Sequence, residues 1–533
     1  MSATTGTPTL ILLNLRRDRV LLPLATVAFA AITASSATAT VELYPDLASR
    51  IQGAELINAT PALVALYGRI YDPLSLGAIA MIKMTGLGTV LVALFTMLTV
   101  VRHTRADEEL GRRELLSAGS VGRYAPLTAA VAVGSLASVA VGLLTAIGLV
   151  AVELPVAGSL AFGLSWTAAA LAFTGVGAVA AQLTSTARAA RGLGAGALAV
   201  AFLLRAAGDS AGAAEPAWPT WLSPIGWAQQ VRPYAGDRWA IALLPTVLAV
   251  LLVALAFALL RRRDMGAGLL PSREGADRAN WLLSGPTGLA WRMQRAGFIG
   301  WMIAFVVLSL VLGQILTNIG EMVDTPVARQ FIVALGGVDG VTDAFLSVEL
   351  SFVAVAAAVY GISGVLRLGH EESAFRGDLV LATATSRLRW AASHLTLAVL
   401  GTGALVLTCG AAVGLAHALQ SGDDSALARD LAAAAVRLPA VWVMVGVTML
   451  LLGVSRRAAP LAWGALLATF LVTELGLLLN LPAWVVDLSP FTHIPHLPGG
   501  EVSPTPVLVL LGAAVALAAA GLVSFRRRDV GVG

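Results

Sequence analysis

The chain is poor in charge, in cysteine and in lysine. Only 12% of its 533 residues are charged, against roughly a quarter in soluble proteins. The single cysteine, Cys409, excludes an intrachain disulfide and a cysteine-based metal cluster, so redox chemistry is not expected. The single lysine, Lys83, lies in an apolar run, whereas a Walker-type ATP site needs a lysine directly after a glycine-rich turn. The six histidines are scattered along the chain. We therefore predict no ATP site, no metal site and no catalytic residue in this chain.

The sequence contains many long apolar segments. Hydrophobic residues make up 57% of the sequence, and one membrane-spanning helix needs about 20 consecutive apolar residues. We predict an all-α polytopic membrane protein with twelve transmembrane helices. The predicted spans lie near residues 20–40, 76–101, 125–152, 156–184, 192–207, 239–260, 298–318, 345–366, 391–419, 433–454, 458–480 and 505–524.

The arginines indicate how the chain is oriented in the membrane. Alternate connections between the predicted spans hold 26 of the 35 arginines and lysines, and the intervening connections hold 7. Because cytoplasmic loops carry the excess of positive charge, we predict that both termini are cytoplasmic in a bacterial plasma membrane. The net charge of +4 arises from these short arginine clusters, so we do not expect a nucleic-acid partner.

Two parts of the sequence repeat at a spacing of half the chain. Residues 261–268 read RRRDMGAG and residues 526–533 read RRRDVGVG, at an offset of 265. The loop Asp107–Arg123 matches Glu371–Arg387 at an offset of 264. Both halves begin and end on the same predicted side, which indicates parallel repeats with a shared cavity at their interface. The predicted organisation is an N-terminal six-helix half at 1–265, a cytoplasmic linker at 266–286 and a C-terminal six-helix half at 287–533.

The first of these repeated loops combines leucines with both signs of charge. It reads ADEELGRRELLSAGSVGRY over Ala106–Tyr124. Leu110, Leu115 and Leu116 fall near one helical face with charged residues around it, which favours a short amphipathic helix over an ordinary solvated loop. The second copy keeps the order of charges, but Ala374 and Phe375 make its apolar face less regular. A repeated amphipathic loop on the cytoplasmic side is typical of a surface that binds a partner.

These features together resemble a known family. A basic amphipathic start, the segment E-x-x-G-R-x-E-L-L-x-A between spans two and three, and six spans per half are similar to the permeases of ABC-2 type exporters. The fused double-length form with RRRD at the end of each half resembles actinobacterial permeases that export polyketide antibiotics and other drugs. The resemblance covers essentially the whole chain.

The resemblance implies that the repeated loops are coupling helices. In that family this loop contacts a separate P-loop ABC ATPase, so ATP and Mg²⁺ would bind to two copies of that subunit and no cofactor would bind to this chain. The expected docking residues are Asp107, Glu108, Glu109, Arg112, Arg113 and Glu114 in the first loop, and Glu371, Glu372, Arg376 and Asp378 in the second. The second loop has Phe375 where the first has Gly111, which predicts unequal docking sites.

Four ionisable residues inside the predicted spans are functional hypotheses because such groups are costly in a membrane. They are Lys83, Glu349, Arg205 and Glu474. Lys83 and Glu349 occupy equivalent depths of spans two and eight, Arg205 and Glu474 occupy equivalent depths of spans five and eleven, and each pair has opposite charges. Since spans two and five line the central pathway in the resembled family, we expect these groups to face it or to pair across the halves. The alternative is that the long side chains extend to the membrane surface.

The predicted function is a membrane permease subunit of an ATP-driven ABC efflux transporter, not an enzyme. An apolar pathway favours hydrophobic or amphiphilic cargo, such as antibiotics and drugs, in contact with membrane lipids. An exporter of lipids or cell-wall precursors fits the same residues. A proton-coupled secondary transporter is the alternative from another class, with Glu153, Glu349 or Glu474 as proton relay.

Overall fold

A computed structural model of the chain describes most of residues 3–528. The residues that it leaves undescribed within this range are 60, 113, 115–118, 213–214, 265, 271–282, 284, 319–337, 424, 476–481, 496 and 499–503. The described residues form helices joined by turns, and they contain no strand. The chain separates into two compact units, Met1–Gly275 and Ala276–Gly533, called here the first half and the second half.

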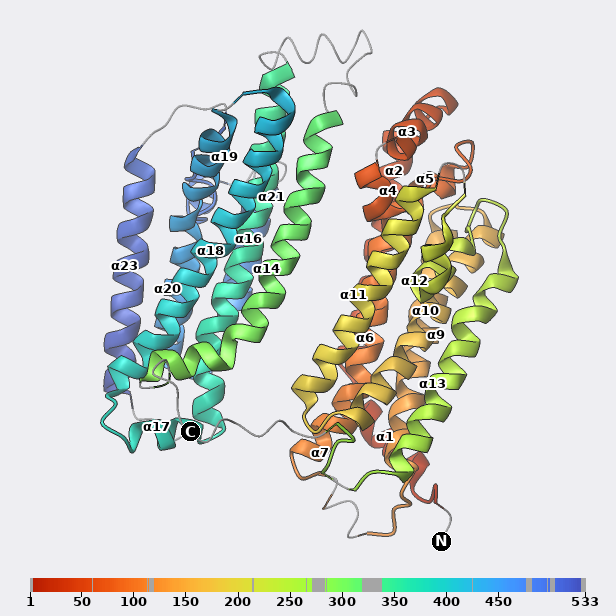
Figure 1. Cartoon of the computed structure of the whole chain (residues 1–533), viewed down its shortest axis with the longest axis horizontal. Coiled ribbons are helices and arrows are strands. Elements are labelled where there is room, and N and C mark those ends of the chain that lie inside the picture. Colours follow the sequence, from red (N-terminus) through yellow and green to blue (C-terminus); the bar gives the residue numbers. More distant parts are fainter. Residues whose placement is uncertain are drawn as a thin grey trace. The chain divides into compact units, whose positions relative to one another are not determined.

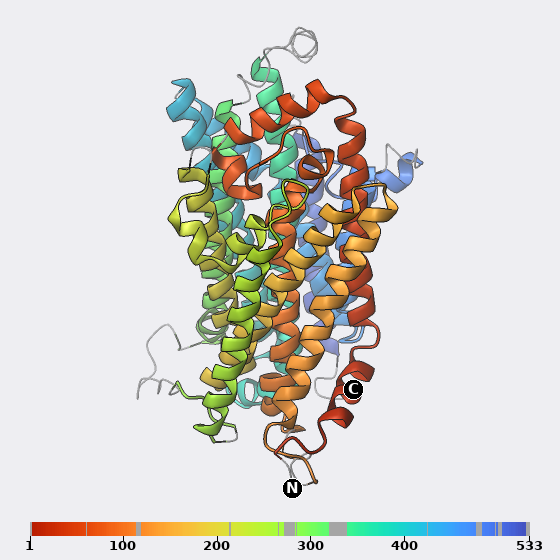
Figure 2. The same cartoon turned by 90° about the vertical axis from the view of Figure 1, so that its right-hand side faces the viewer.

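The first half is a bundle of long helices with short helices at its ends (Figure 1). Its long helices are α2 (Leu21–Leu43), α6 (Thr89–Val101), α9 (Ala125–Ala151), α10 (Val156–Leu183), α11 (Ala187–Ala211) and α13 (Leu243–Arg261). Its shorter elements are α1 (Thr7–Arg17), α3 (Leu47–Ala59), α4 (Pro61–Tyr67), α5 (Leu76–Lys83), α7 (Asp107–Glu109) and α12 (Pro224–Gln230), with two π-helical segments, η1 (Met84–Gly88) and η2 (Arg102–Ala106), and two 3-10 segments, η3 (Trp218–Leu222) and η4 (Trp239–Ala242). The helices α3 and α4 lie at the end of the bundle opposite to the N terminus (Figures 1 and 2).

The second half has a similar order of elements. Its helices are α14 (Pro286–Asn318), α16 (Val338–Ser373), α17 (Arg376–Leu381), α18 (Arg387–Ser421), α19 (Ala426–Ala435), α20 (Leu438–Val454), α21 (Leu461–Leu475), α22 (Ala483–Val486) and α23 (Pro504–Arg527). In both halves a long helix leads into the repeated loop, namely α6 in the first and α16 in the second. The RRR triplet follows or ends the last long helix of each half, α13 or α23.

The all-α polytopic architecture is confirmed, whereas the count of twelve spans stays a prediction. Ten helices among the described residues are long and apolar enough to cross a membrane. The predicted spans near 298–318 and 458–480 fall on α14 and α21, and the residues that follow each of these helices are undescribed.

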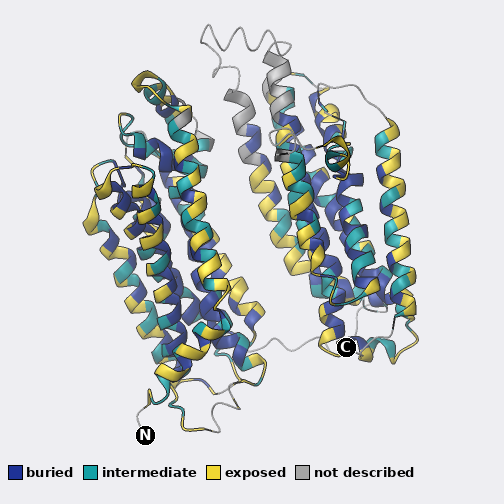
Figure 3. Ribbon diagram, turned by 180° about the vertical axis from the view of Figure 1, so that it is seen from behind, coloured by how far each residue is buried: buried dark blue, intermediate teal, exposed yellow. Residues whose placement is uncertain are grey.

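Exposed residues cover the outer faces of the bundles (Figure 3), and many of them are large and apolar. On α13, Val250 is 66% exposed and Leu251 is 62% exposed, and on α23 both Leu508 and Val509 are 64% exposed. A continuous apolar exterior of this kind is unfavourable in water but matches the hydrocarbon core of a bilayer. The exposed apolar residues therefore fit a multi-pass membrane protein.

Glycines bring neighbouring helices into backbone contact. A Cβ added to Gly142 on α9 would lie 2.3 Å from the carbonyl oxygen of Gly163 on α10, and a Cβ added to Gly453 on α20 would lie 2.3 Å from the carbonyl oxygen of Gly521 on α23. Small residues at helix interfaces stabilise membrane bundles because they allow close van der Waals packing. This packing holds α9 against α10 and α20 against α23, and the ends of the bundles carry the charged side chains described next.

In each repeated loop a turn separates a long helical segment from a shorter one. In the first loop, α6 continues through η2 into α7, which ends at Glu109, and Gly111 follows with a φ of 69°. In the second loop the six-residue helix α17 follows Phe375, which has a φ of 55°. Both loops thus place a left-handed residue at the same position of the repeat. Leu115 and Leu116 lie outside the described residues, so the predicted apolar face stays a prediction.

Candidate functional site

Helices α1 and α7 and the end of α13 lie at one end of the first half (Figure 1), and charged side chains gather there. We call this the arginine-rich end of the first half, and the end formed by α17 and the end of α23 is the arginine-rich end of the second half. The acidic residues of the repeated loops and the arginines of the RRR triplets meet there.

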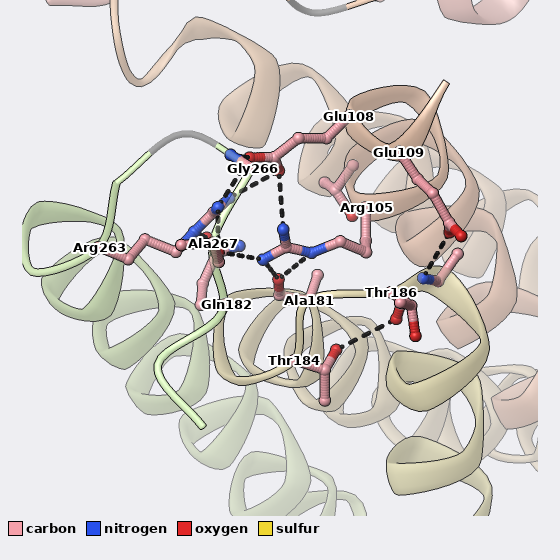
Figure 4. Close-up of polar contacts among 12 residues, drawn as sticks. Arg105, Glu108, Glu109, Ala181, Gln182, Thr184, Thr186, Arg263, Gly266 and Ala267 are labelled. Carbon is pink, nitrogen blue, oxygen red and sulfur yellow. Dashed lines mark hydrogen bonds and ion pairs between the residues drawn. The ribbon is translucent and has the colours of Figure 1, made fainter. Parts of the chain in front are cut away.

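Glu108 binds the last arginine of the first triplet (Figure 4). Both carboxylate oxygens of Glu108 accept hydrogen bonds from Arg263, Oε1 from Nη1 and Oε2 from Nη2, each at 2.8 Å. The amide of Gly266 also donates to Glu108 Oε1, at 2.7 Å. The two side chains are 3% and 4% exposed, and Arg263 Nε donates to Gln182 Oε1 at the end of α10 at 2.8 Å. A buried bidentate pair of this kind is among the strong charge-assisted contacts in proteins, so it fixes α7 against α10 and the end of α13.

Arg105 extends the same network (Figure 4). Its guanidinium donates twice to the carbonyl oxygen of Ala181, at 2.9 and 2.6 Å, and once to that of Ala267, at 3.2 Å. Its Nη1 lies 3.4 Å from Glu108 Oε2. Helix C-termini leave carbonyl groups without intrahelical partners and carry partial negative charge, which explains why a buried arginine is stable at the end of α10.

Asp107 and Asp18 connect the loop to α1. Arg17 forms a bidentate pair with Asp107 at 2.6 and 2.8 Å, and Arg112 donates to Asp107 Oδ1 at 3.0 Å. The hydrogen bond to Asp107 raises the pKa of Arg17. The fully buried Asp18 contacts Arg102 at 2.9 Å and His103 at 2.6 Å. The first loop is therefore held by α1 as well as by α10 and α13.

Glu109 makes a backbone contact to the next long helix. Its Oε2 accepts a hydrogen bond from the amide of Ala187, the first residue of α11, at 2.9 Å. A carboxylate at this position satisfies a free amide of the first turn and interacts favourably with the helix dipole. Glu109 therefore joins the loop to α11.

The second half repeats the central contact. Glu372 Oε2 accepts from Arg528 Nη2 at 2.6 Å, and Glu371 pairs with Arg376 at 2.6 Å. The offset between Glu108 and Glu372 is 264 residues, and that between Arg263 and Arg528 is 265. We call these two equivalent ion pairs, Glu108–Arg263 and Glu372–Arg528, the clasps of the first and second half.

A further arginine supports each clasp. Arg123 donates to the carbonyl oxygens of Leu260 at 2.8 Å and Arg263 at 3.2 Å. The equivalent Arg387 donates to the carbonyl oxygen of Arg528 at 3.0 Å. Each half thus uses the same residue of its repeated loop to hold the end of its last helix.

The clasps explain why the RRR triplets recur. The RRR triplets marked the ends of the two halves, but their binding to Glu108 and Glu372 was not predicted. The available signal was that the acids and the triplets recur together at nearly the same offset, which is the pattern that a conserved contact within each half produces.

The structure divides the predicted docking residues into two groups. Buried carboxylates that bind inside their own half form the first group, namely Asp107, Glu108, Glu371 and Glu372. Exposed residues form the second group, namely Glu109, Arg112, Glu114, Arg376 and Asp378. Arg113 lies outside the described residues. Contact with a partner stays a prediction for all of them, and within this chain the first group positions the loop.

Arg205, predicted to face the pathway or to pair across the halves, has partners inside the first half. Its fully buried guanidinium lies 3.6 Å from Asp209 Oδ2, one helical turn along α11. It donates to the carbonyl oxygen of Leu66 at 3.2 Å and stacks on Phe202 at 4.5 Å. Asp209 also accepts from Thr220 at 2.9 Å. The i, i+4 spacing of Arg205 and Asp209 was the sequence signal for this pair.

The other three ionisable residues of the predicted spans lie in different environments. Lys83 is exposed on the surface of the first half at the end of α5, next to the π-helical segment η1. Glu349 is half-buried on α16. Glu474 belongs to α21, and its side chain is outside the part of the chain that the structure describes. Their role at a pathway stays a prediction.

Comparison with known proteins gives two matches. Residues 283–526 match the family model of the C-terminal domain of the multidrug efflux system permease Rv1217c. The chain is also 42% identical over 532 residues to the multidrug efflux system permease protein Rv1217c of Mycobacterium tuberculosis (strain ATCC 25618 / H37Rv), and the alignment covers 99% of this chain and 96% of that protein. The similarity therefore extends over both halves.

Proposed function

The chain belongs to the family of the multidrug efflux system permease Rv1217c, and from that premise we propose that it is the membrane subunit of an ATP-driven ABC efflux transporter. Two copies of a separate P-loop ATPase would hydrolyse ATP with Mg²⁺, and each would dock on one arginine-rich end. The chain itself would act through a change of conformation and not through chemistry.

The observation that carries this proposal is the clasp present in both halves. A loop that transmits force from a partner must be rigidly joined to the helices that it moves. Glu108 joins α7 to the end of α13 and, through Arg263, to Gln182 of α10. Glu372 joins the end of α16 to the end of α23 through Arg528. A displacement of either loop is thereby transmitted to the last helix of its half.

Exposed residues beside the clasps supply the docking surface in this proposal. In the first loop Leu110 is 64% exposed between Glu109 and Arg112. In the second loop Phe375 and Leu379 are 67% and 75% exposed, beside Arg376 and Asp378. An apolar side chain surrounded by charges of both signs is the usual composition of a specific protein interface. The buried acids Asp107, Glu108, Glu371 and Glu372 would act as positioning residues.

The same proposal assigns the orientation in the membrane. The arginine-rich ends face the cytoplasm because positive charge is retained on that side, so both termini are cytoplasmic and the membrane is the bacterial plasma membrane. Lys83, Glu349 and Glu474 would be the ionisable groups near the pathway, and Arg205 with its partner Asp209 would stabilise α11. The cargo would be hydrophobic or amphiphilic, as the efflux name of the relative supports.

The test is affinity purification of the full chain from its native membrane, followed by an ATPase assay with and without candidate drugs. We expect a P-loop subunit to co-purify and its ATP hydrolysis to rise with transported compounds. Leu110→Asp combined with Leu379→Asp should abolish co-purification because it places charge in the docking surface. The control is Leu488→Asp, since this leucine is similarly exposed, at 69%, but lies outside both repeated loops.

The clasp variants separate docking from coupling. Glu108→Gln with Glu372→Gln should retain the ATPase subunit but weaken the response of ATP hydrolysis to drugs, because the loops stay exposed and lose their attachment. A chain that purifies alone and moves cargo in response to a pH gradient would contradict the proposal and favour a proton-coupled transporter. Export of lipid precursors, but not of drugs, would retain the ATPase partnership and change the cargo.

A further inference from the structure

A cavity of about 370 Å³ lies inside the second half, away from the clasp. Its wall includes Ser347 and Ser351 at the beginning of α16, Thr473 at the end of α21, and Phe491 and Ile494 after α22. These residues lie at the end of the helices opposite to α17. Its size is within the range of small-molecule sites in proteins.

The charged residue of this wall is Arg437, at the junction of α19 and α20. Its side chain is 1% exposed. Nη1 donates to the carbonyl oxygens of Ala433 and Leu497, at 2.5 and 3.1 Å. Nη2 donates to the carbonyl oxygen of Ser347 at 2.6 Å and to its hydroxyl at 3.1 Å. The Nε–H finds no acceptor among the described residues, so one donor of the guanidinium is left over.

No carboxylate among the described residues forms an ion pair with Arg437. Asp430, on the same side of the bundle, binds His417 at 2.9 Å and Arg429 at 3.5 Å. Asp343 also lies near Arg429, at 3.8 Å. Glu349 follows Ser347 by two positions on α16, about 200° around the helix, and so extends from a different face. Buried charges in proteins are almost always paired, so the cavity wall carries a positive charge whose counter-ion is missing from the described residues.

The rest of the wall is suited to a molecule with an apolar part. Val348, Val472, Phe491 and Ile494 contribute apolar side chains to it. Val348 is 53% exposed, so the cavity reaches the surface of the second half. A ligand with one anionic group and one aliphatic chain would place the anion at Arg437 and the chain along α16.

We infer that this cavity binds the carboxylate or phosphate group of an anionic amphiphile through Arg437. The remaining Nε–H can donate one charge-assisted hydrogen bond to an oxygen of either group. The ligand is either a membrane lipid with an anionic head group or an amphiphile that the transporter carries. This inference goes beyond the proposed function and holds with or without an ATPase partner.

The experiment uses the full chain in nanodiscs of phosphatidylcholine. The probes are dodecyl phosphate and dodecanoate, with dodecyltrimethylammonium as the cationic control of equal chain length. The readout is the rise of the thermal unfolding midpoint with probe concentration, from which an apparent affinity is obtained. Both anionic probes should raise the midpoint of the wild-type protein, and the cationic probe should not.

Two variants test the site itself. Arg437→Gln should weaken binding of dodecyl phosphate by about tenfold or more, because it removes the charge-assisted contact. Arg429→Gln is the matched control, since it removes a half-exposed arginine of the neighbouring helix α19 and should leave binding unchanged. If Arg437→Gln fails to fold, Ser351→Leu fills the cavity from α16, keeps the guanidinium, and should also weaken binding.

Three results would overturn the inference. The first is equal binding of the cationic probe, and the second is unchanged binding by both Arg437→Gln and Ser351→Leu. The third is a wild-type protein that binds no anionic probe while Glu474→Gln does, since the chain would then supply its own counter-ion. The source of the ligand follows from replacing part of the phosphatidylcholine by phosphatidylglycerol. Competition with dodecyl phosphate would identify a lipid head group, and unchanged affinity would identify a transported amphiphile.

Discussion

The arginine-rich ends of the two halves share a clasp and its supporting arginine but differ in other contacts of the loop. In the first half, Arg105 and Glu109 add contacts from the loop to α10 and α11. At the equivalent positions the second half has Gly369 and Ser373, and Ser373 donates to the carbonyl oxygen of Gly369 within α16 itself. The second loop therefore lacks the side chains that join the first loop to its neighbours.

The second half has a cavity near its loop. It measures about 220 Å³ and lies between α14, α17 and α18, with Leu379, Trp390 and His394 in its wall. In the first half the corresponding helix α1 is packed on α9 through Leu10, Ala125 and Ala129, all buried. A shared ion pair therefore does not make the two loops equivalent, because the rigidity of each loop depends on the side chains around its ion pair. We expect the first loop to be the stiffer of the two.

The largest expected effect comes from breaking the first clasp. Glu108→Gln should lower the free energy of unfolding by about 3–5 kcal/mol, because it leaves the buried Arg263 without its counter-ion. Unfolding of the purified chain in neutral detergent measures the change. Glu55→Gln, at an exposed position of α3, should have almost no effect. Equal destabilisation by the two variants would show that the clasp is not a special contact.

Removing Arg105 takes away a loop contact that the second half, with Gly369 at the equivalent position, also lacks. Arg105→Ala should cost about 2–3 kcal/mol, since hydrogen bonds from a buried charged group to carbonyl oxygens are lost. The control is Arg112→Ala, because Arg112 is 52% exposed and surface ion pairs contribute about 0–1 kcal/mol. If both variants unfold at the same denaturant concentration, the contact of Arg105 with α10 contributes nothing to stability.

The second clasp should contribute less than the first. Glu372→Gln is expected to lower the free energy of unfolding by about 1–2 kcal/mol. Arg528 is 16% exposed and binds Glu372 through one short contact, whereas Arg263 is 3% exposed and binds Glu108 through two. The test compares Glu372→Gln and Glu108→Gln in the same unfolding experiment. A larger effect in the second half would reverse the order of stiffness proposed above.

The smallest expected effect concerns the left-handed residue of each loop. Gly111→Ala should cost about 1 kcal/mol because alanine is strained at a positive φ. In Phe375→Ala the backbone strain should change the free energy of unfolding by less than about 0.5 kcal/mol. Phenylalanine already carries a Cβ at the same φ, so the substitution adds no new strain. A Cβ at Gly111 meets no atom of the described residues within 4 Å, so the expected cost comes from the backbone conformation. A neutral Gly111→Ala would show that the turn relaxes without strain.

Much of the fold was accessible from the sequence, and less of the site was. Apolar runs predicted the polytopic helical architecture because the bilayer fixes the length and composition of each span. The offset of 264 residues correctly aligned Gly111 with Phe375, and both adopt the same left-handed conformation. The acids of the loops were also recognisable in the sequence, but as residues that contact a partner. The sequence did not predict that Glu108 and Glu372 are buried within their own halves.

The sequence by itself determined the membrane-embedded class of this protein, its lack of a Walker lysine motif, and its construction from two related parts. These properties depend on composition and on local patterns, which need no knowledge of distant neighbours. The tertiary structure alone decided which charges face inward and which stay exposed. A cluster such as RRRD is compatible with a solvated helix end or with a buried ion pair. The choice depends on whether the end of a helix such as α13 meets an acid 155 residues away in the chain, and only the packing of the helices determines that.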